Sequence, residues 1–387
     1  MAIVKLAEVC EKIGSGATPR GGKEAYCDEG ISLVRSQNVL DFNFSKEGLA
    51  FINDEQAKKL SNVEVHSGDV LLNITGDSVA RACLMDDDYL PARVNQHVAI
   101  IRGNSHKIMN GYVLYYLQWR KEYLLQLASA GATRNALTKA MIEQLELDLP
   151  PLDSQQQIVA ILDSLQSKIQ LNQKTNDNLL AQAQTLYKQF FPYGVQDDLP
   201  DGWRIGTVGE IIEIHDSKRI PLSGADRSKM EKKIYPYYGA ASLMDLVDNY
   251  IFDGKYLLLG EDGTVVDDAG YPILQYVWGQ FWVNNHAHIL TGRLGYDVES
   301  LYMLFKQTPV KSIVTGAVQP KISQANLRSV QVVIPPEHNL REYNDLVEPL
   351  FSLFRANEDE CKTFTALRDT LLPKLMSGEI DVSAVQL

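Results

Sequence analysis

The chain has 387 residues, 45% of them hydrophobic and 22% charged, which is typical of a globular protein of two or more domains. Its 37 basic and 49 acidic residues give a net charge of −12, so it lacks the bulk positive charge of an autonomous nucleic-acid-binding protein. No apolar run approaches the roughly 18 residues of a transmembrane helix, the first residues lack the apolar core of a signal peptide, and the cysteines form no CxxC pair, so we expect a protein of a reducing cytoplasm.

Residues 1–150 carry the pattern of a mixed α/β domain. Apolar and β-branched runs at residues 31–35, 68–75 and 94–103 predict strands, because such side chains are enriched in sheets. Residues 111–128 have helical spacing and aromatic bulk. We therefore expect a first globular domain that ends near the pair Pro150-Pro151.

A long helix is predicted over residues 153–191, which contain no Gly or Pro and are rich in helix-favouring residues. Prolines are tolerated at a helix start, as at Pro150-Pro151. Alternating steps of four and three residues trace a coiled-coil seam: Ile158, Leu162, Leu165, Ile169, Asn172, Asn176, Leu179, Ala183, Leu186 and Phe190. A rod of roughly 57 Å cannot be buried in one compact domain, so it needs a partner helix.

Residues 192–335 repeat the plan of the first domain with different contents. Residues 5–13, 68–74, 94–103 and 131–151 recur at offsets of 199, 186, 189 and 185, as residues 204–212, 254–260, 283–292 and 316–336. A recurrence of this kind indicates a tandem duplication. The drift in offset places the insertions in loops between framework strands.

A second long helix is predicted over residues 337–378, after Pro335-Pro336. Adding 185 to the first seam gives a second one: Tyr343, Val347, Leu350, Phe354, Asn357, Cys361, Phe364, Arg368, Leu371 and Leu375. Asn357 falls on the equivalent of Asn172, and since a seam Asn fixes register, both are predicted alignment devices. Pro373 should kink or end the helix near its last turn. The alternative is a pair of unrelated amphipathic helices that each cover a core.

No catalytic constellation is evident in the sequence. His286 and His288 lie two apart on a presumed strand, but no third ligand accompanies them, so polar packing is favoured over a metal site. We predict no catalytic residue and no metal ligand.

The order of domain, helix, domain and helix resembles the specificity subunit (HsdS) of type I restriction–modification systems. PPLDSQQQIVAILD at the first helix and LRDTLLPKLMSGEIDV near the carboxyl end resemble the family's helix opening and its usual finish. GSGATPRGGKEAY with ISLVRSQNV is similar to a common target-recognition-domain opening, and YPYYGA with YLLLGEDG to another. The second helix departs, with Glu337-His338-Asn339-Leu340 where the family often has Gln-Gln.

The resemblance implies an α/β (α+β) fold with two tandem target-recognition domains and an antiparallel coiled coil with pseudo-two-fold symmetry. The expected boundaries are 1–150 for the first domain, 151–191 for the first spacer helix, 192–335 for the second domain, and 336–387 for the second helix and tail. The implied function is a non-catalytic DNA sequence-specificity subunit of the prokaryotic cytoplasm. Each domain would read half of a split, asymmetric target in double-stranded DNA, and the helices would set the spacer.

The resemblance also implies partners and cofactors. Two methyltransferase (HsdM) subunits and restriction (HsdR) subunits would dock on this chain, with no membrane involved. S-adenosylmethionine would belong to the methyltransferase, ATP and Mg to the restriction partner, and no cofactor to this chain. Because phosphate contacts dominate DNA affinity, a chain of net charge −12 should bind DNA weakly alone and rely on its partners for a positive cleft.

Candidate DNA contacts are donor-rich loop residues, since Arg suits guanine and Asn or Gln suits adenine. In the first domain they are Thr18, Arg20, Lys23, Arg35, Gln37, Asn38, Arg81, Arg93 and Arg134. In the second domain they are Lys218, Arg219, Lys232, Lys233, Tyr237, Tyr238 and Lys321. Asn95, His97, Asn284 and His286 recur in both halves, so they suit framework hydrogen bonds or phosphate positioning better than base readout.

The candidates for helix pairing are the seam residues with the strongest pattern. They are Leu162, Leu165, Ile169, Asn172, Leu179, Leu186, Val347, Leu350, Phe354, Asn357, Phe364 and Leu371.

Three alternative functions stay open from the sequence. One is the specificity subunit of a related two-part system, in which a single partner both methylates and cuts. Another is a coiled-coil scaffold without DNA, which the acidity favours. The third is a methyltransferase or nuclease fused to its own reader, which the missing catalytic motifs disfavour.

Overall fold

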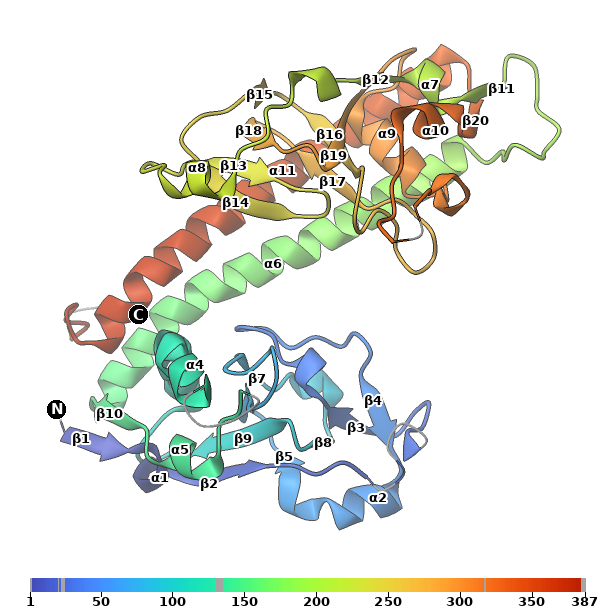
Figure 1. Ribbon diagram of the computed structural model, residues 1–387. Coiled ribbons are helices and arrows are strands. Elements are labelled where there is room, and N and C mark those ends of the chain that lie inside the picture. Colours follow the sequence, from blue (N-terminus) through green and yellow to red (C-terminus); the bar gives the residue numbers. More distant parts are fainter. Residues whose placement is uncertain (1, 20, 22–24, 130–134, 317, 384–387) are drawn as a thin grey trace. The chain divides into compact units, whose positions relative to one another are not determined.

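The structure is a computed structural model that describes residues 2–19, 21, 25–129, 135–316 and 318–383. The chain forms two compact units: residues 1–172 with 360–387, and residues 173–359. Each unit contains one globular domain and one segment of each of two long helices, α6 (Leu152–Phe190) and α11 (Glu337–Met376) (Figure 1). In the described part of the chain, no helix combines the length and the hydropathy needed to cross a bilayer.

The first globular domain contains three sheets. Their strand orders are β1-β10, β2-β9-β6-β7 and β4-β3-β8-β5. The strands are β1 Ala2–Lys5, β2 Cys10–Ser15, β3 Ile31–Val34, β4 Ala50–Ile52, β5 Glu64–Val65, β6 Val70–Asn73, β7 Ala82–Leu84, β8 Ala92–Val94, β9 Val98–Gly103 and β10 Glu146–Leu149. The helices are α1 Leu6–Val9, α2 Asp54–Lys59, α3 Asn110–Trp119, α4 Lys121–Ser129 and α5 Lys139–Glu143. The helix predicted over residues 111–128 is therefore two helices, separated at Arg120.

The second globular domain has the same three sheets. Their orders are β11-β20, β12-β19-β16-β17 and β14-β13-β18-β15, and the β13–β18 pair is parallel, as is β3–β8. The strands are β11 Arg204–Thr207, β12 Ile212–Ile214, β13 Tyr235–Tyr238, β14 Leu243–Val247, β15 Phe252–Asp253, β16 Tyr256–Gly260, β17 Leu274–Val277, β18 Gln280–Val283, β19 Ala287–Gly292 and β20 Gln331–Ile334. The helices are α7 Val208–Ile211, α8 Gly224–Ser228, α9 Val298–Phe305 and α10 Gln324–Ser329. The predicted duplication is confirmed.

Strand pairing corrects two of the predicted offsets between the repeats. Lys5 pairs with Glu146 and Thr207 with Gln331, so the first element recurs at 202 rather than 199. Val70 and Leu257 occupy equivalent places opposite β9 and β19, an offset of 187 rather than 186. A slip of one residue exchanges the two faces of a strand, and runs of similar apolar residues hide such a slip in the sequence.

The two long helices run antiparallel within each unit. In the first, Gln166 accepts a hydrogen bond from Arg368, and Asn172 donates to Glu360. In the second, Asn357 donates to Asn176, and the Tyr187 ring packs edge-on against Tyr343. In both units, a higher number on α6 meets a lower number on α11. The observed bounds match the two predicted helices closely, and α11 ends one turn after Pro373.

The helices share a hydrophobic core with each domain. Ile158 and Leu162 of α6 and Leu375 of α11 pack with the first domain, whereas Ala183 of α6 and Val347 of α11 pack with the second. All twelve predicted helix-pairing residues are buried or half-buried. Burial of apolar seam residues is the main favourable term in such packing, so each domain is held to its own helix segments.

Candidate nucleic-acid interface

An Asn-x-His turn precedes the central strand of each domain. In the first domain the buried side chain of Asn95 accepts a hydrogen bond from the His97 N–H at 3.0 Å. In the second, the buried Asn284 accepts one from the His286 N–H at 2.8 Å. The expected framework hydrogen bonds are therefore present in both halves.

The same backbone contacts surround each turn. The N–H groups of Ile74 and Glu261 donate to the carbonyls of His97 and His286, respectively. The carbonyls of Ile74 and Glu261 in turn accept from the N–H groups of Leu137 and Ile322. Three segments that are distant in the sequence thus meet at one place in each domain.

The imidazoles of the two turns have different partners. His97 Nδ1 lies 2.6 Å from Thr75 Oγ1, and the equivalent bond of His286 Nδ1 is to Asp262. In the first domain, Thr18 and Gln96 extend this polar chain, because Thr18 donates to Gln96 and Gln96 contacts His97 Nε2. The backbone contacts of the Asn-x-His turn are therefore repeated in the two domains, whereas the side-chain partners of the two imidazoles differ.

Several predicted contacts of the first domain are committed to internal bonds. Asn38 is fully buried, accepts from the Arg35 N–H, and donates to the carbonyls of Ser45 and Glu47. Arg93 is also buried and donates to the carbonyls of Ala57 and Ala92. In this conformation both side chains brace the domain and present nothing to a ligand.

The remaining predicted residues of the first domain differ in exposure. Gln37 is exposed but donates to the carbonyls of Glu47 and Gly48, and the half-buried Arg35 also donates to the Gly48 carbonyl. Thr18 and Arg81 are half-buried. Arg20, Lys23 and Arg134 lie outside the described residues.

The connection between β3 and β4, which carries Arg35, Gln37 and Asn38, docks on the long helices of its own unit. Phe42, at its middle, adopts a left-handed backbone conformation (φ 61°), which is uncommon for a bulky residue. The Arg368 guanidinium of α11 lies 4.0 Å from the centre of the Phe42 ring, and the Phe42 carbonyl accepts from Gln170 of α6. The intramolecular bonds of Asn38 and Gln37 therefore hold the β3–β4 connection, residues 35–49, in a fixed conformation against the helices. We call this connection the clasp.

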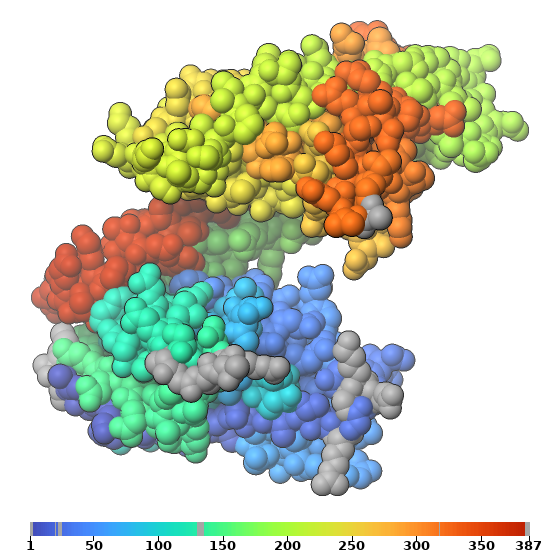
Figure 2. All heavy atoms as spheres, in the orientation of Figure 1, coloured from blue at the N-terminus to red at the C-terminus, as the bar shows by residue number. Residues whose placement is uncertain are grey.

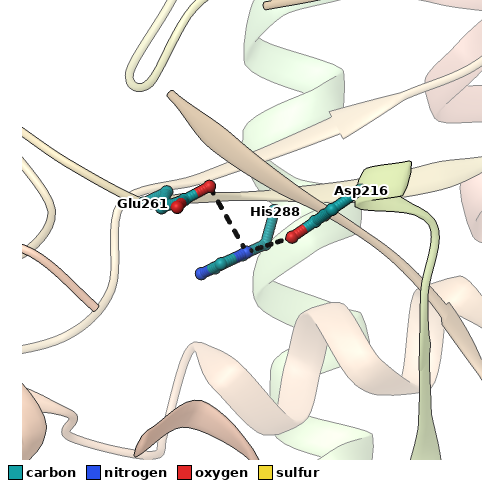
Figure 3. Close-up of side chains that lie close together, drawn as sticks. All are labelled: Asp216, Glu261 and His288. Carbon is teal, nitrogen blue, oxygen red and sulfur yellow. Dashed lines mark hydrogen bonds and ion pairs between the residues drawn. The ribbon is translucent and has the colours of Figure 1, made fainter. Parts of the chain in front are cut away.

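Three titratable side chains of the second domain converge in a buried cluster: Asp216, Glu261 and His288 (Figure 3). Their ligand-type atoms lie within 4.8 Å of one another, on the segment after β12, the end of β16 and the strand β19. The sequence did not reveal this set, because its members are separated by up to 72 residues. The signal that could have found two of them is that Glu261 and His288 stand where the first repeat has the apolar Ile74 and Ala99.

Protein groups already occupy the donor atoms of this cluster. His288 Nδ1 lies 2.6 Å from Asp216 Oδ2, and its Nε2 lies 2.8 Å from the Ile322 carbonyl. Both ring nitrogens of His288 are therefore engaged by other protein groups. Arg219 donates to Glu261 at 2.6 Å, and Lys321 lies 3.2 Å from the same carboxylate. The cations Arg219 and Lys321 thus supply the positive charge that a metal ion would bring. The cluster is an internal ion network.

The carboxylates of the network respond to these neighbours. Burial by itself raises the pKa of Asp216, but the hydrogen bonds from His288 and the Ile289 N–H hold that pKa below its ordinary value. The pKa of Glu261 is also lowered, because Arg219, His288 and Lys321 together outweigh the effect of burial. Arg219 and Lys321, predicted to contact DNA, instead neutralise buried carboxylates in this conformation.

The other predicted contacts of the second domain lie on or just before β13, except Lys218, which lies just after β12. Tyr237 is buried, and its hydroxyl accepts from the Leu222 N–H. Tyr238 is half-buried, and burial raises the pKa of its phenol. Lys233 lies 3.4 Å from Asp245, whereas Lys218 and Lys232 are exposed. Among these five residues, the two exposed lysines are the most accessible to a ligand.

Comparison with known proteins places this chain in a family. The family model described as "Type I restriction modification DNA specificity domain" matches residues 1–181 and 200–355. The type I restriction enzyme MjaIX specificity subunit of Methanocaldococcus jannaschii is 22% identical over 98% of this chain and 93% of its own length. The putative MjaX specificity subunit of the same organism is 19% identical over the same shares. A crystal structure of the S subunit of a type I restriction-modification system from M. genitalium matches with a TM-score of 0.61 at 15% identity, over 97% of this chain and 96% of that one, which shows the fold.

Proposed function

Because the chain belongs to the family of type I restriction modification DNA specificity domains, we propose that it reads a split, asymmetric target in double-stranded DNA. Specificity subunits of this family determine DNA target recognition and are non-catalytic. In our proposal residues 1–150 read one half-site, residues 192–335 read the other, and the helices α6 and α11 set the spacer between them.

The observation that carries this proposal is one strand order used twice with different side chains at equivalent places. Sequence-specific readout needs different donors, acceptors and apolar groups for different bases. A repeated frame presents such groups in two similar settings, whereas the contrast between Thr75 and Asp262 beside the two His residues changes what is presented. Two unlike half-sites are the expected consequence.

The repeated frame also supports the proposed partners. Two copies of one methyltransferase subunit require two similar docking surfaces, and an antiparallel helix pair with one domain per helix offers them. Restriction subunits then complete the complex. S-adenosylmethionine is the cofactor of the methyltransferase in this proposal, ATP and Mg serve the restriction subunit, and none of these groups is assigned to residues of this chain.

The contacts within each domain narrow our set of DNA-contacting residues. We retain Thr18, Gln37 and Arg81 of the first domain and Lys218, Lys232, Lys233 and Tyr238 of the second as direct contacts. Asn38, Arg93 and Tyr237 are assigned to holding the loops because they are buried, Arg219 and Lys321 because they neutralise Glu261, and Arg35 because it bonds the Gly48 carbonyl. Thr18, Gln37 and Lys233 also bond within their own domains, and in this proposal they exchange those bonds for contacts with DNA. Loop residues held in place from behind lose less conformational entropy on binding.

Long-read methylation mapping tests this function. DNA from cells that carry the chain with its methyltransferase is compared with DNA from cells that lack only the chain. We expect a bipartite, asymmetric methyladenine motif that disappears without the chain. An unchanged methylome, with expression of the methyltransferase verified, contradicts the proposal and favours a scaffold.

A further inference from the structure

The β13–β14 hairpin of the second domain exposes apolar side chains on a sheet edge. Strand β14 pairs only with β13 among the described strands, so its other edge is open. Leu243 is 52% exposed, Met244 54% and Leu246 39%, and Ile234, just before β13, is 60% exposed. An open edge with several exposed apolar residues is a surface that natural proteins usually cover or use.

The hairpin is short and firmly held. Its turn closes with a hydrogen bond of 2.9 Å from the Gly239 N–H to the Ser242 carbonyl. Asp245 of β14 pairs with Arg227 of α8 at 3.1 Å, and the Arg227 guanidinium lies 4.8 Å from the centre of the Tyr237 ring of β13. The ribbon is therefore presented in a defined position.

Exposed lysines lie on the segment before this hairpin, although residues 224–248 carry four basic and four acidic side chains. Lys218, Lys229 and Lys232 are exposed, and none of them forms an ion pair among the described residues. The nearby acids are engaged: Asp248 accepts from the N–H groups of Glu231 and Lys233, and Asp226 accepts from the hydroxyl of Ser223, the residue that caps α8. The α8 segment and the hairpin form one continuous yellow-green surface of the second domain (Figure 2).

The equivalent edge of the first domain is covered. Strand β4 forms a bridge through Phe51 to Cys27, and its Ala50 and Ile52 are buried. The connection from β3 to β4 there is the long clasp around Phe42, whereas the connection from β13 to β14 is a tight turn. Among the residues that the structure describes, the exposed apolar ribbon thus belongs to the second domain alone.

We propose that the β13–β14 hairpin is a base-reading ribbon for the second half-site, in which Leu243 and Met244 contact thymine methyl groups in the major groove. The major groove admits a two-stranded ribbon, and apolar side chains distinguish thymine by its C5-methyl group. Lys229 and Lys232, which lie between α8 and β13, are exposed and suit the flanking phosphates. This inference rests on the proposed function and assigns one element to one half of the target.

The asymmetry of the two domains favours DNA over a protein partner as the occupant. A methyltransferase that binds twice needs the same docking surface in both halves. An element that differs in length, exposure and content between the halves suits the part of the complex that also differs, which is the DNA sequence.

Synthetic DNA that lacks single thymine methyl groups tests whether the β13–β14 hairpin contacts them. The protein used is the complex of this chain with its methyltransferase. Once the motif is mapped, each thymine of the second half-site is replaced by deoxyuridine, which lacks only the methyl group. We expect roughly fourfold weaker binding for at least one replacement, the factor associated with one buried methyl-sized group. In the L243A/M244A variant the same replacement should have no effect, and its methylation map should keep the first half-site and relax an A·T position in the second.

The control is Ile205→Ala, which shortens a similarly exposed apolar residue on β11 of the same domain. It should respond to deoxyuridine as the wild type does. The inference is overturned by a second half-site without an A·T pair, by a variant that retains the full deoxyuridine effect, or by one that no longer assembles with the methyltransferase. Loss of the bipartite motif in the wild type itself would instead refute the proposed function.

Discussion

Behind the Asn-x-His turn, the first domain places Ile74, Ala99 and Ala136, and the second places Glu261, His288 and Lys321 at the equivalent positions. Ile74 and Ala99 are buried in apolar surroundings, whereas the second set forms an ion network with Asp216 and Arg219. The same backbone arrangement therefore accommodates apolar side chains in one domain and titratable side chains in the other. Strand order is held by the backbone ladders, and the side chains behind the loops are free to differ.

The domains also differ in how they dock on their helix segments. The first uses Phe42 against Arg368 and a bond of 2.6 Å from Tyr115 to Asp163. The second uses Arg355 of α11, which donates to Tyr276, to Glu348 and to the buried Glu299. A charged contact with a buried carboxylate is costly to leave incomplete, so the second domain should be the more sensitive to loss of a docking residue.

The largest effect is expected from Asp216→Ala, which has no counterpart in the first domain. The change leaves His288, the Ile289 N–H and Gln324 without the carboxylate that each of them contacts. Breaking a buried charge pair costs about 3 to 5 kcal/mol. Hydrogen exchange resolved by peptide should show this loss in the second domain while the first stays protected. The exposed Asp268→Ala is the control, and equal loss from both variants would refute a structural network.

Arg355→Ala should lower the free energy of unfolding more than Arg368→Ala does, although both effects are smaller than that of Asp216→Ala. Arg355→Ala should cost about 2 to 3 kcal/mol, since it removes charge-assisted bonds from Glu299 and Glu348. Arg368→Ala loses the Phe42 ring contact and the bond to Gln166, for about 1 to 2 kcal/mol. Denaturant unfolding of the two variants measures the difference. The reverse order would contradict the proposed contrast in docking.

Acid should weaken the second domain through its ion network. The pKa values of Asp216 and Glu261 are lowered in the folded state, so the unfolded state binds more protons as the pH falls past their ordinary values near 4. The contribution is present above that range and is lost below it, as the pH falls through the lowered values. Exchange protection of β16 and β19 should therefore fall in acid, and D216N should reduce this dependence. An unchanged pH profile in D216N would contradict this explanation.

The smallest effect on folding is expected from Lys218→Ala and Lys232→Ala. Both side chains are exposed, so the free energy of unfolding should change by less than about 0.5 kcal/mol. If each lysine contacts a phosphate, the salt dependence of DNA binding by the complex should fall by about one unit per lysine. Filter binding over a salt series measures this slope, and an unchanged slope would remove these residues from the interface.

The sequence predicted the duplication and both long helices because their signals are local or recur at a fixed distance. The seam around Leu162 and Val347, and the Pro-Pro pairs before each helix, need no knowledge of tertiary contacts. The offsets of the first element and of β16 were wrong because apolar residues recur often enough for a shifted register to match equally well.

The roles of the basic residues could not be predicted in the same way. Arg219 meets Glu261 across 42 residues of sequence, and Asn38 bonds to carbonyls that carry no sequence signal. Loop position and donor capacity made both good candidates for DNA contact, but only the fold shows that their donors are already used. Lys218 and Lys232 are exposed and remain predicted DNA contacts.

Replacement of one domain by the other tests most directly whether each domain reads its own half-site. Residues 192–335 are exchanged for a second copy of residues 1–150, and the methylome is mapped with the native methyltransferase present. We expect the first half-site to be kept and the second to become its inverted copy, which is the result expected from the pseudo-two-fold symmetry that the family resemblance implies. Retention of the original asymmetric motif by an assembled complex would contradict the account.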